Sequence, residues 1–97
     1  MAIGLRLKFA GGTQEQYIAV HDHLNIESRP PHGLIFHSSG PIDGGWGVLD
    51  VWHSRNDFDQ FAEGRLMPAV AELGDRAFPG PPDIKVFSVH NYTTPRL

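Results

Sequence analysis

The chain has 97 residues, no cysteine and a formal net charge of −3 at pH 7. This length suits one domain, 1–97, and a chain without cysteine has no disulfides and no thiolate metal sites. The negative charge gives no basic footprint for nucleic acid, and no apolar run approaches the roughly 20 residues that cross a bilayer. We therefore expect a cytoplasmic globular protein that binds neither nucleic acid nor membrane.

Four strands are predicted from apolar runs that end at turn residues. They are expected over 2–9, 33–40, 46–53 and 84–92. The first alternates between apolar and polar residues, which is typical of a strand with one face in a core. The second and third are joined by the turn residues of 41–45, so they form a hairpin.

Two helical segments separate these strands, and each begins at a capping residue. Thr13 with Gln16 forms a capping box, and Ser54 with Asp57 at the third helical position starts the second helix. Pro68 within the second segment removes a backbone hydrogen bond, so we expect a kink or two abutting helices there. The apolar stripes that face inward contain Tyr17, Val20, His21 and Leu24, then Phe58, Phe61, Ala62, Leu66, Ala69, Val70 and Leu73.

The order strand, helix, strand, strand, helix, strand is the βαββαβ pattern of ferredoxin-like folds. We expect an α+β protein with a four-stranded antiparallel sheet, both helices on one face and the first and third strands central. The third strand is apolar on both faces: Trp46, Val48 and Trp52 share one, and Leu49 and Val51 share the other. Because the helices cover only one face, a second copy is expected to cover the other, which predicts a homodimer.

The charges of the central strands have two interpretations. Asp50 and either Arg6 or Lys8 are expected on the face away from the helices, where they form an ion pair or remain solvated at the rim. Asp50 is also a conceivable catalytic acid or base. Trp46 and Trp52 are expected to fill the barrel or its dimer interface.

The junction 51–54, Val-Trp-His-Ser, followed by Phe58 and Phe61, resembles the V-W-x-S strand-to-helix junction of the dimeric α+β barrel superfamily. That superfamily includes antibiotic-biosynthesis-monooxygenase-like proteins, haem-degrading enzymes and isomerases. The resemblance implies a ligand pocket between the helices and the sheet of each subunit. In the haem-degrading branch, the resemblance implies an asparagine on the first strand and a tryptophan and a ligand histidine on the second helix. This chain has no asparagine on the first strand, Phe61 falls at the tryptophan position, and Ala71 falls near the histidine position. No haem and no other cofactor is expected.

A cofactor-independent oxygenase needs aromatic walls, a general base that works near neutral pH and a hydrogen-bond donor. Histidine suits the base role, so His21 and His37 are the predicted catalytic residues. Tyr17, Phe61 and His90 are the predicted substrate-binding residues. The alternative is that the histidines are hydrogen-bonded packing residues and that Tyr17 and Phe61 belong to a filled core.

The orientation of His37 depends on the register of the hairpin. Pairing across the turn places His37 opposite Leu49 on the helix-facing side, and a slip of one residue would turn it to the dimer face. No metal site is predicted, because His21 and His23 do not share a helix face and no other histidine spacing favours one.

The expected function is binding of a small aromatic or polyketide-like compound, as a cofactor-independent monooxygenase. The alternative is a non-catalytic ligand-binding or accessory module, or a dimeric scaffold whose pocket is filled by side chains. A helix–sheet cavity below roughly 300 Å³ would favour the scaffold, because drug-sized ligands need more space.

Overall fold

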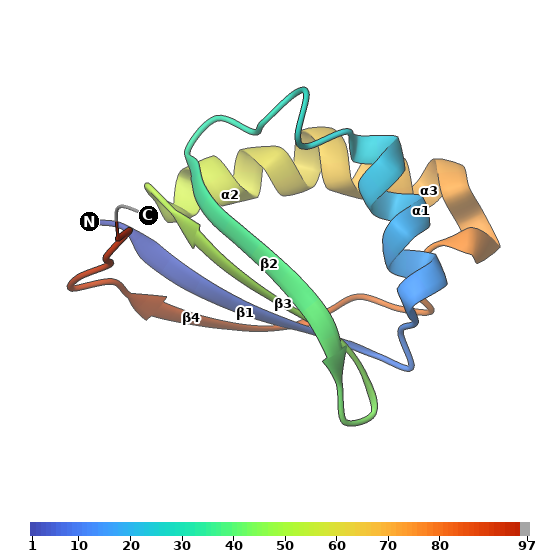
Figure 1. Cartoon of the computed structure of the whole chain (residues 1–97). Coiled ribbons are helices and arrows are strands. Elements are labelled where there is room, and N and C mark those ends of the chain that lie inside the picture. The colour runs from blue at the N-terminus through green and yellow to red at the C-terminus, as the bar shows by residue number, and fades with distance from the viewer. Residues whose placement is uncertain (96–97) are drawn as a thin grey trace.

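The computed structural model describes residues 1–95 and has a four-stranded sheet with helices on one face (Figure 1). The elements are β1 (Ile3–Ala10), α1 (Gln14–Leu24), β2 (Leu34–Ile42), β3 (Gly45–Trp52), α2 (Arg55–Phe61), the π-helical η1 (Ala62–Leu66), α3 (Met67–Leu73), the 3₁₀ turn η2 (Gly74–Arg76) and β4 (Asp83–Ser88). The strand order is β2-β3-β1-β4, and every pairing is antiparallel. The predicted ferredoxin-like α+β fold is confirmed. No helix within 1–95 is long and apolar enough to span a membrane.

Both predicted helix caps are present. The Thr13 hydroxyl accepts from the Gln16 amide at 3.2 Å, and the Gln16 side chain accepts from the Thr13 amide at 2.9 Å. The Ser54 hydroxyl accepts from the Asp57 amide at 3.1 Å. Each contact satisfies an amide that the first helical turn leaves without a backbone partner, so both helices begin where the sequence predicts.

The proline in the second helical segment is accommodated by a π-helical turn. Within η1 the hydrogen bonding widens, and the Met67 amide bonds the carbonyl of Ala62, five residues back. Pro68 follows directly at the start of α3, and the wider turn before it accommodates a residue that cannot donate a backbone hydrogen bond. The expected discontinuity is therefore this π-helical turn inside one helical run.

The last strand is shorter than the predicted 84–92. β4 ends at Ser88, which pairs with Ile3 at the start of β1. Beyond Ser88, the Val89 amide donates to the carbonyl of Ala2 at 2.9 Å. Because β1 offers no partner beyond this point, His90 lies outside the strand and is exposed.

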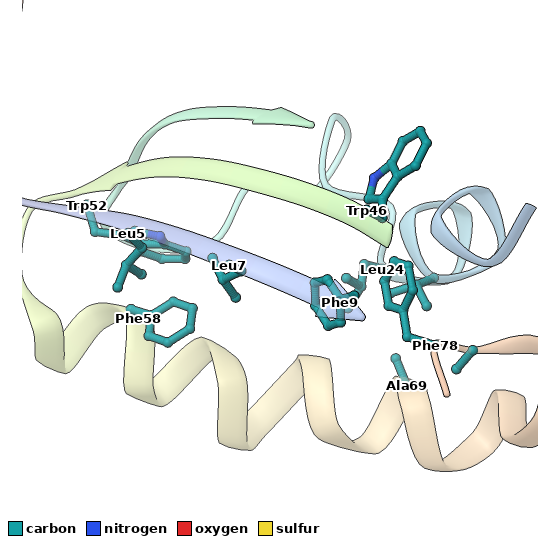
Figure 2. Packing of buried hydrophobic residues seen from close by; sticks show 11 residues of the cluster. Leu5, Leu7, Phe9, Leu24, Trp46, Trp52, Phe58, Ala69 and Phe78 are labelled. Carbon is teal, nitrogen blue, oxygen red and sulfur yellow. The ribbon is translucent and has the colours of Figure 1, made fainter. Parts of the chain in front are cut away.

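The core forms between the sheet and the helical run α2–α3. Figure 2 shows Leu5, Leu7 and Phe9 of β1 pointing toward this run, with Phe58 and Ala69 reaching from it. Leu5 is fully buried, and the other four side chains are less than a tenth exposed. Burial of such side chains stabilises a fold by roughly 1.5–3 kcal/mol each, so this layer provides much of the driving force for folding.

The face of β3 that meets the helices differs from the expectation. Leu5 is directly opposite Asp50, so Trp46, Asp50 and Trp52 share the helix-facing side of the sheet and are buried. Arg6 is opposite Leu49 and therefore lies on the open face. The predicted pairing of Asp50 with Arg6 or Lys8 is wrong, and so is the alternative of a solvated Asp50 at the rim. The two tryptophans fill the helix–sheet core of the chain.

The β2–β3 register also differs by one residue. His37 pairs with Asp50 instead of Leu49, because the two-residue turn at 43–44 sets one register from Ile42 through Phe36. The bulge between Leu34 and Phe36 lies farther from the turn and restores the predicted pairing at Leu34. The two differences from the prediction cancel for His37. Its partner on β3 is Asp50 instead of Leu49, and it is Asp50, not Leu49, that faces the helices. His37 therefore still faces the helices, as expected.

Candidate functional site

A small cavity lies between α1, the sheet and α2. Its water-accessible volume is about 60 Å³, and most of its lining is apolar. The titratable residues in this lining are Tyr17, His21, His37 and Asp50. The volume is well below the roughly 300 Å³ of a drug-sized site, so in this form the cavity accommodates water molecules rather than a large ligand.

The buried end of the polar group is Asp50, whose side chain is 8% exposed. One carboxylate oxygen lies 2.7 Å from Nδ1 of His37, and the other accepts the Nε1–H of Trp52 at 3.2 Å. A buried carboxylate is costly unless such donors surround it. Asp50 therefore favours the histidine tautomer with hydrogen on Nδ1, which leaves Nε2 to act toward the cavity.

Tyr17 connects this pair to a second histidine. Its hydroxyl lies 2.7 Å from Nε2 of His37 and 3.0 Å from Nδ1 of His21. The Trp46 ring stacks on the Tyr17 ring, with centroids 5.4 Å apart, and helps to fix it in place. Burial raises the pKa of Tyr17, and the negative charges of Glu27 and Asp50 act in the same direction, so the hydroxyl is a phenol at neutral pH.

The exposed end is Glu27, whose side chain is 74% exposed. Its carboxylate lies 2.6 Å from Nε2 of His21, and this hydrogen bond lowers the pKa of Glu27. A continuous chain of hydrogen bonds thus runs from Asp50 through His37, Tyr17 and His21 to Glu27. We refer to these five residues as the Asp50–Glu27 chain.

Local structure explains how these side chains meet. Tyr17 and His21 are one turn apart on α1, a spacing that places two side chains side by side. His37 and Asp50 are a cross-strand pair of the β2–β3 hairpin. The segment with Glu27 is held by Arg65 of η1, which donates to the carbonyl of Leu24 at 2.7 Å and to that of Arg29 at 2.8 Å.

Four of the five residues predicted for the site line one cavity: Tyr17, His21, His37 and Phe61. The structure does not bring His90 to this cavity. Asp50 is a candidate acid or base from the sequence, and it lies on the helix-facing side of the sheet instead of the predicted open face. Glu27 was not predicted, because it lies in the irregular segment after α1, where no periodic pattern shows which side chain it meets.

The site carries no recognisable metal-binding geometry. Within residues 1–95, no group of three or more histidine, aspartate or glutamate side chains is placed to hold a metal ion. The polar atoms of the site instead bond one another in a line, an arrangement suited to holding and moving protons.

No protein-family model matches the chain, and no curated protein sequence matches it.

Solved structures do match. Rv0793 from Mycobacterium tuberculosis has a TM-score of 0.68 at 15% identity, over 97% of this chain and 100% of that one. An antibiotic biosynthesis monooxygenase candidate from Chloroflexus aurantiacus J-10-fl has a TM-score of 0.65 at 15% identity, with 96% and 98% covered. SnoaB, a cofactor-independent oxygenase from Streptomyces nogalater, has a TM-score of 0.62 at 16% identity, with 98% and 97% covered. At these identities the likeness concerns the fold, and that fold is the one of antibiotic-biosynthesis-monooxygenase-like proteins.

Proposed function

We propose that the protein binds a small, electron-rich aromatic or polyketide-like compound and removes a proton from it, as a cofactor-independent monooxygenase. The observation that carries this proposal is His37, held between the buried carboxylate of Asp50 and the hydroxyl of Tyr17 at an apolar cavity. A carboxylate–histidine pair beside an apolar wall has the elements of a general base.

The chemistry follows from the order of the groups. Asp50 accepts hydrogen from Nδ1 of His37, so Nε2 can accept the hydroxyl hydrogen of Tyr17. The Tyr17 hydroxyl gives its proton to Nε2 of His37, and the Tyr17 oxygen takes a proton from the substrate. The substrate anion remains in the cavity. In the oxygenation of an activated methylene, that anion donates electrons to O₂. One oxygen atom forms the new carbonyl, and the other leaves as water.

The fold supports this proposal through SnoaB, which is a cofactor-independent oxygenase of the same architecture. The aromatic lining supports it as well, since Trp52, Phe58 and Phe61 surround the cavity and offer flat apolar contact to a ring system.

A scaffold or non-catalytic binding module is the second candidate, and the cavity volume of about 60 Å³ favours it. A substrate of two or more rings fits only if the cavity widens on binding. The two candidates therefore differ in one measurable property: an enzyme or ligand carrier opens this cavity for a compound, whereas a scaffold keeps it closed.

The test is a panel of phenolic and polycyclic ketone compounds, examined by thermal shift and by oxygen consumption. We expect one class of compound to raise Tm and to be oxidised, and His37→Ala to abolish oxidation while the protein stays folded. His23→Ala is the matched control, because His23 lies on the same helix as His21 but is 40% exposed and bonds Glu72. Full turnover by the His37→Ala protein would rule out the assignment of His37.

We also propose that the protein is a homodimer formed through the open face of its sheet. Phe36 and Phe87 are 50% exposed on this face, and Leu49 is 43% exposed between them. The Phe87 ring lies directly against Gly4, where a side chain would collide with it. Large exposed apolar side chains gathered on one face are typical of a protein interface.

The dimer is tested by sedimentation at micromolar concentration. We expect about twice the 10.7 kDa mass of one chain, and Leu49→Asp should give the monomer. Ile18→Asp is the matched control, since Ile18 is 45% exposed on α1, away from the open face of the sheet. A wild-type protein that sediments as a stable monomer would refute the proposal.

A further inference from the structure

The hydrogen bonds of the Asp50–Glu27 chain imply a count of protons. The chain has four contacts between its five groups, with heavy-atom distances from 2.6 to 3.0 Å. Each contact this short needs one hydrogen atom between its two heavy atoms, because two facing lone pairs repel. The complete chain therefore holds four hydrogen atoms along its line.

The neutral side chains supply too few hydrogens. Neutral His37, Tyr17 and His21 each provide one hydrogen, and the carboxylates of Asp50 and Glu27 only accept. Three hydrogens cannot fill the four contacts. If Tyr17 donates to His37, His21 must donate to Tyr17 through Nδ1, and its Nε2 lone pair then faces Glu27. If Tyr17 donates to His21, the missing hydrogen is on His37.

We propose that the Asp50–Glu27 chain holds one proton beyond those of its neutral side chains, shares it between His37 and His21 through Tyr17, and exchanges it with solvent at Glu27. Moving the proton from His21 to His37 takes two transfers along existing hydrogen bonds: Nδ1 of His21 gives its hydrogen to the Tyr17 oxygen, and the Tyr17 hydroxyl gives its own hydrogen to Nε2 of His37. Glu27 is then a positioning residue: it touches no substrate and acts through His21. The inference extends the proposed function by giving the buried base a route to water.

Few charged or titratable groups lie near this proton in the described part of the chain, residues 1–95. From α1, β2 and β3, the lining of the cavity contributes Tyr17, His21, His37 and Asp50. Glu27 comes from the segment after α1. Arg65 of η1 donates to the backbone carbonyls of Leu24 and Arg29, which flank Glu27, so it helps to fix the position of Glu27 and makes none of the four contacts.

The substitution Glu27→Gln tests the count directly. The amide introduced at position 27 can donate hydrogen to Nε2 of His21. The amide then donates to His21, His21 donates to Tyr17, Tyr17 donates to His37, and His37 donates to Asp50. The three neutral groups therefore fill the remaining contacts without an additional proton. The variant removes the need for the shared proton while it keeps the length and hydrogen bonding of the side chain.

The measurement is ¹⁵N NMR of the histidine side chains at pH 7. In the wild type we expect three ring N–H groups, summed over His21 and His37, which amounts to one imidazolium shared by the pair. In Glu27→Gln we expect two, both at Nδ1. The His37 signals should change although Glu27 does not contact His37, and in a Tyr17→Phe background the same substitution should leave His37 unchanged.

The matched control is Glu72→Gln, because Glu72 bonds His23 at 2.7 Å on the surface without a second histidine behind it. It should alter the His23 signals alone. Two ring N–H groups in the wild type, or three in Glu27→Gln, would overturn the proposal. The readout needs no turnover, so a protein that lacks oxygenase activity yet shows three N–H groups would retain this inference and reject the proposed function.

Discussion

The buried carboxylate of Asp50 allows a sharp prediction about stability. Asp50→Ala leaves the Nε1–H of Trp52 and the Nδ1–H of His37 without their acceptor, in a region where Trp52 is 1% exposed. Each buried donor left unsatisfied costs about 1–3 kcal/mol, and breaking a buried polar pair costs about 3–5 kcal/mol in total. We expect a loss of about 3–5 kcal/mol in the free energy of unfolding.

Asp50→Asn separates the charge of the side chain from its shape. If its oxygen accepts from Trp52, its amide donates to Nδ1 of His37, so both contacts persist as neutral hydrogen bonds. Neutral bonds are about half as strong as charge-assisted ones, and the loss should be only about 1–2 kcal/mol. The tautomer of His37 is then reversed: Nε2 carries hydrogen and cannot accept the proton of Tyr17. The protein should stay folded and lose the base that the proposed function needs.

Urea and thermal denaturation at pH 7 measure these losses, and ¹⁵N NMR reports the tautomer. In the thermal experiment, a loss of 1 kcal/mol lowers Tm by about 4–8 °C for a chain of this size, so the two variants are easily distinguished. Asp59→Asn is the matched control, because Asp59 is 47% exposed and forms a surface ion pair with Arg55. Such a pair contributes about 0.3–0.5 kcal/mol. A loss below about 1 kcal/mol for Asp50→Ala would refute the reasoning about buried donors.

Three further predictions concern the core, a helix cap and the exposed end of the Asp50–Glu27 chain. Leu5 is fully buried, so Leu5→Ala should cost about 3–5 kcal/mol in urea denaturation, and a loss near zero would contradict the described core. Ser54→Ala removes the acceptor for the Asp57 amide and should cost about 1 kcal/mol, which rescue by Ser54→Thr would assign to the cap. The hydrogen bond from His21 lowers the pKa of Glu27 below its ordinary 4.5, so its contribution to stability is present above pH 4.5 and is lost as the pH falls through the lowered value. Glu27→Gln should flatten this part of the acid titration of stability, and an unchanged slope would contradict the contact.

Much of the fold was predictable because it depends on local patterns. Thr13 and Ser54 begin their helices wherever the chain goes next, since each cap bonds an amide only a few residues away. The alternation of β1 and the element order then leave few ways to arrange four strands and two helical segments. The inward stripe of α1 likewise identified Tyr17 and His21 as neighbours before any tertiary contact was known.

The sequence by itself determined the order of the elements, their caps and the residues that share each face. The tertiary structure decided which face of β3 packs on the helices and which stays open. A period of two shows that Trp46 and Trp52 lie together, but a strand that is apolar on both sides gives no sign of the side that packs on the helices. The two-residue turn at 43–44 set the hairpin register one residue away from the predicted pairing, and this placed His37 against Asp50. Glu27 joined them only because the segment after α1 returns to the site, and a contact made by an irregular segment leaves no periodic trace in the sequence.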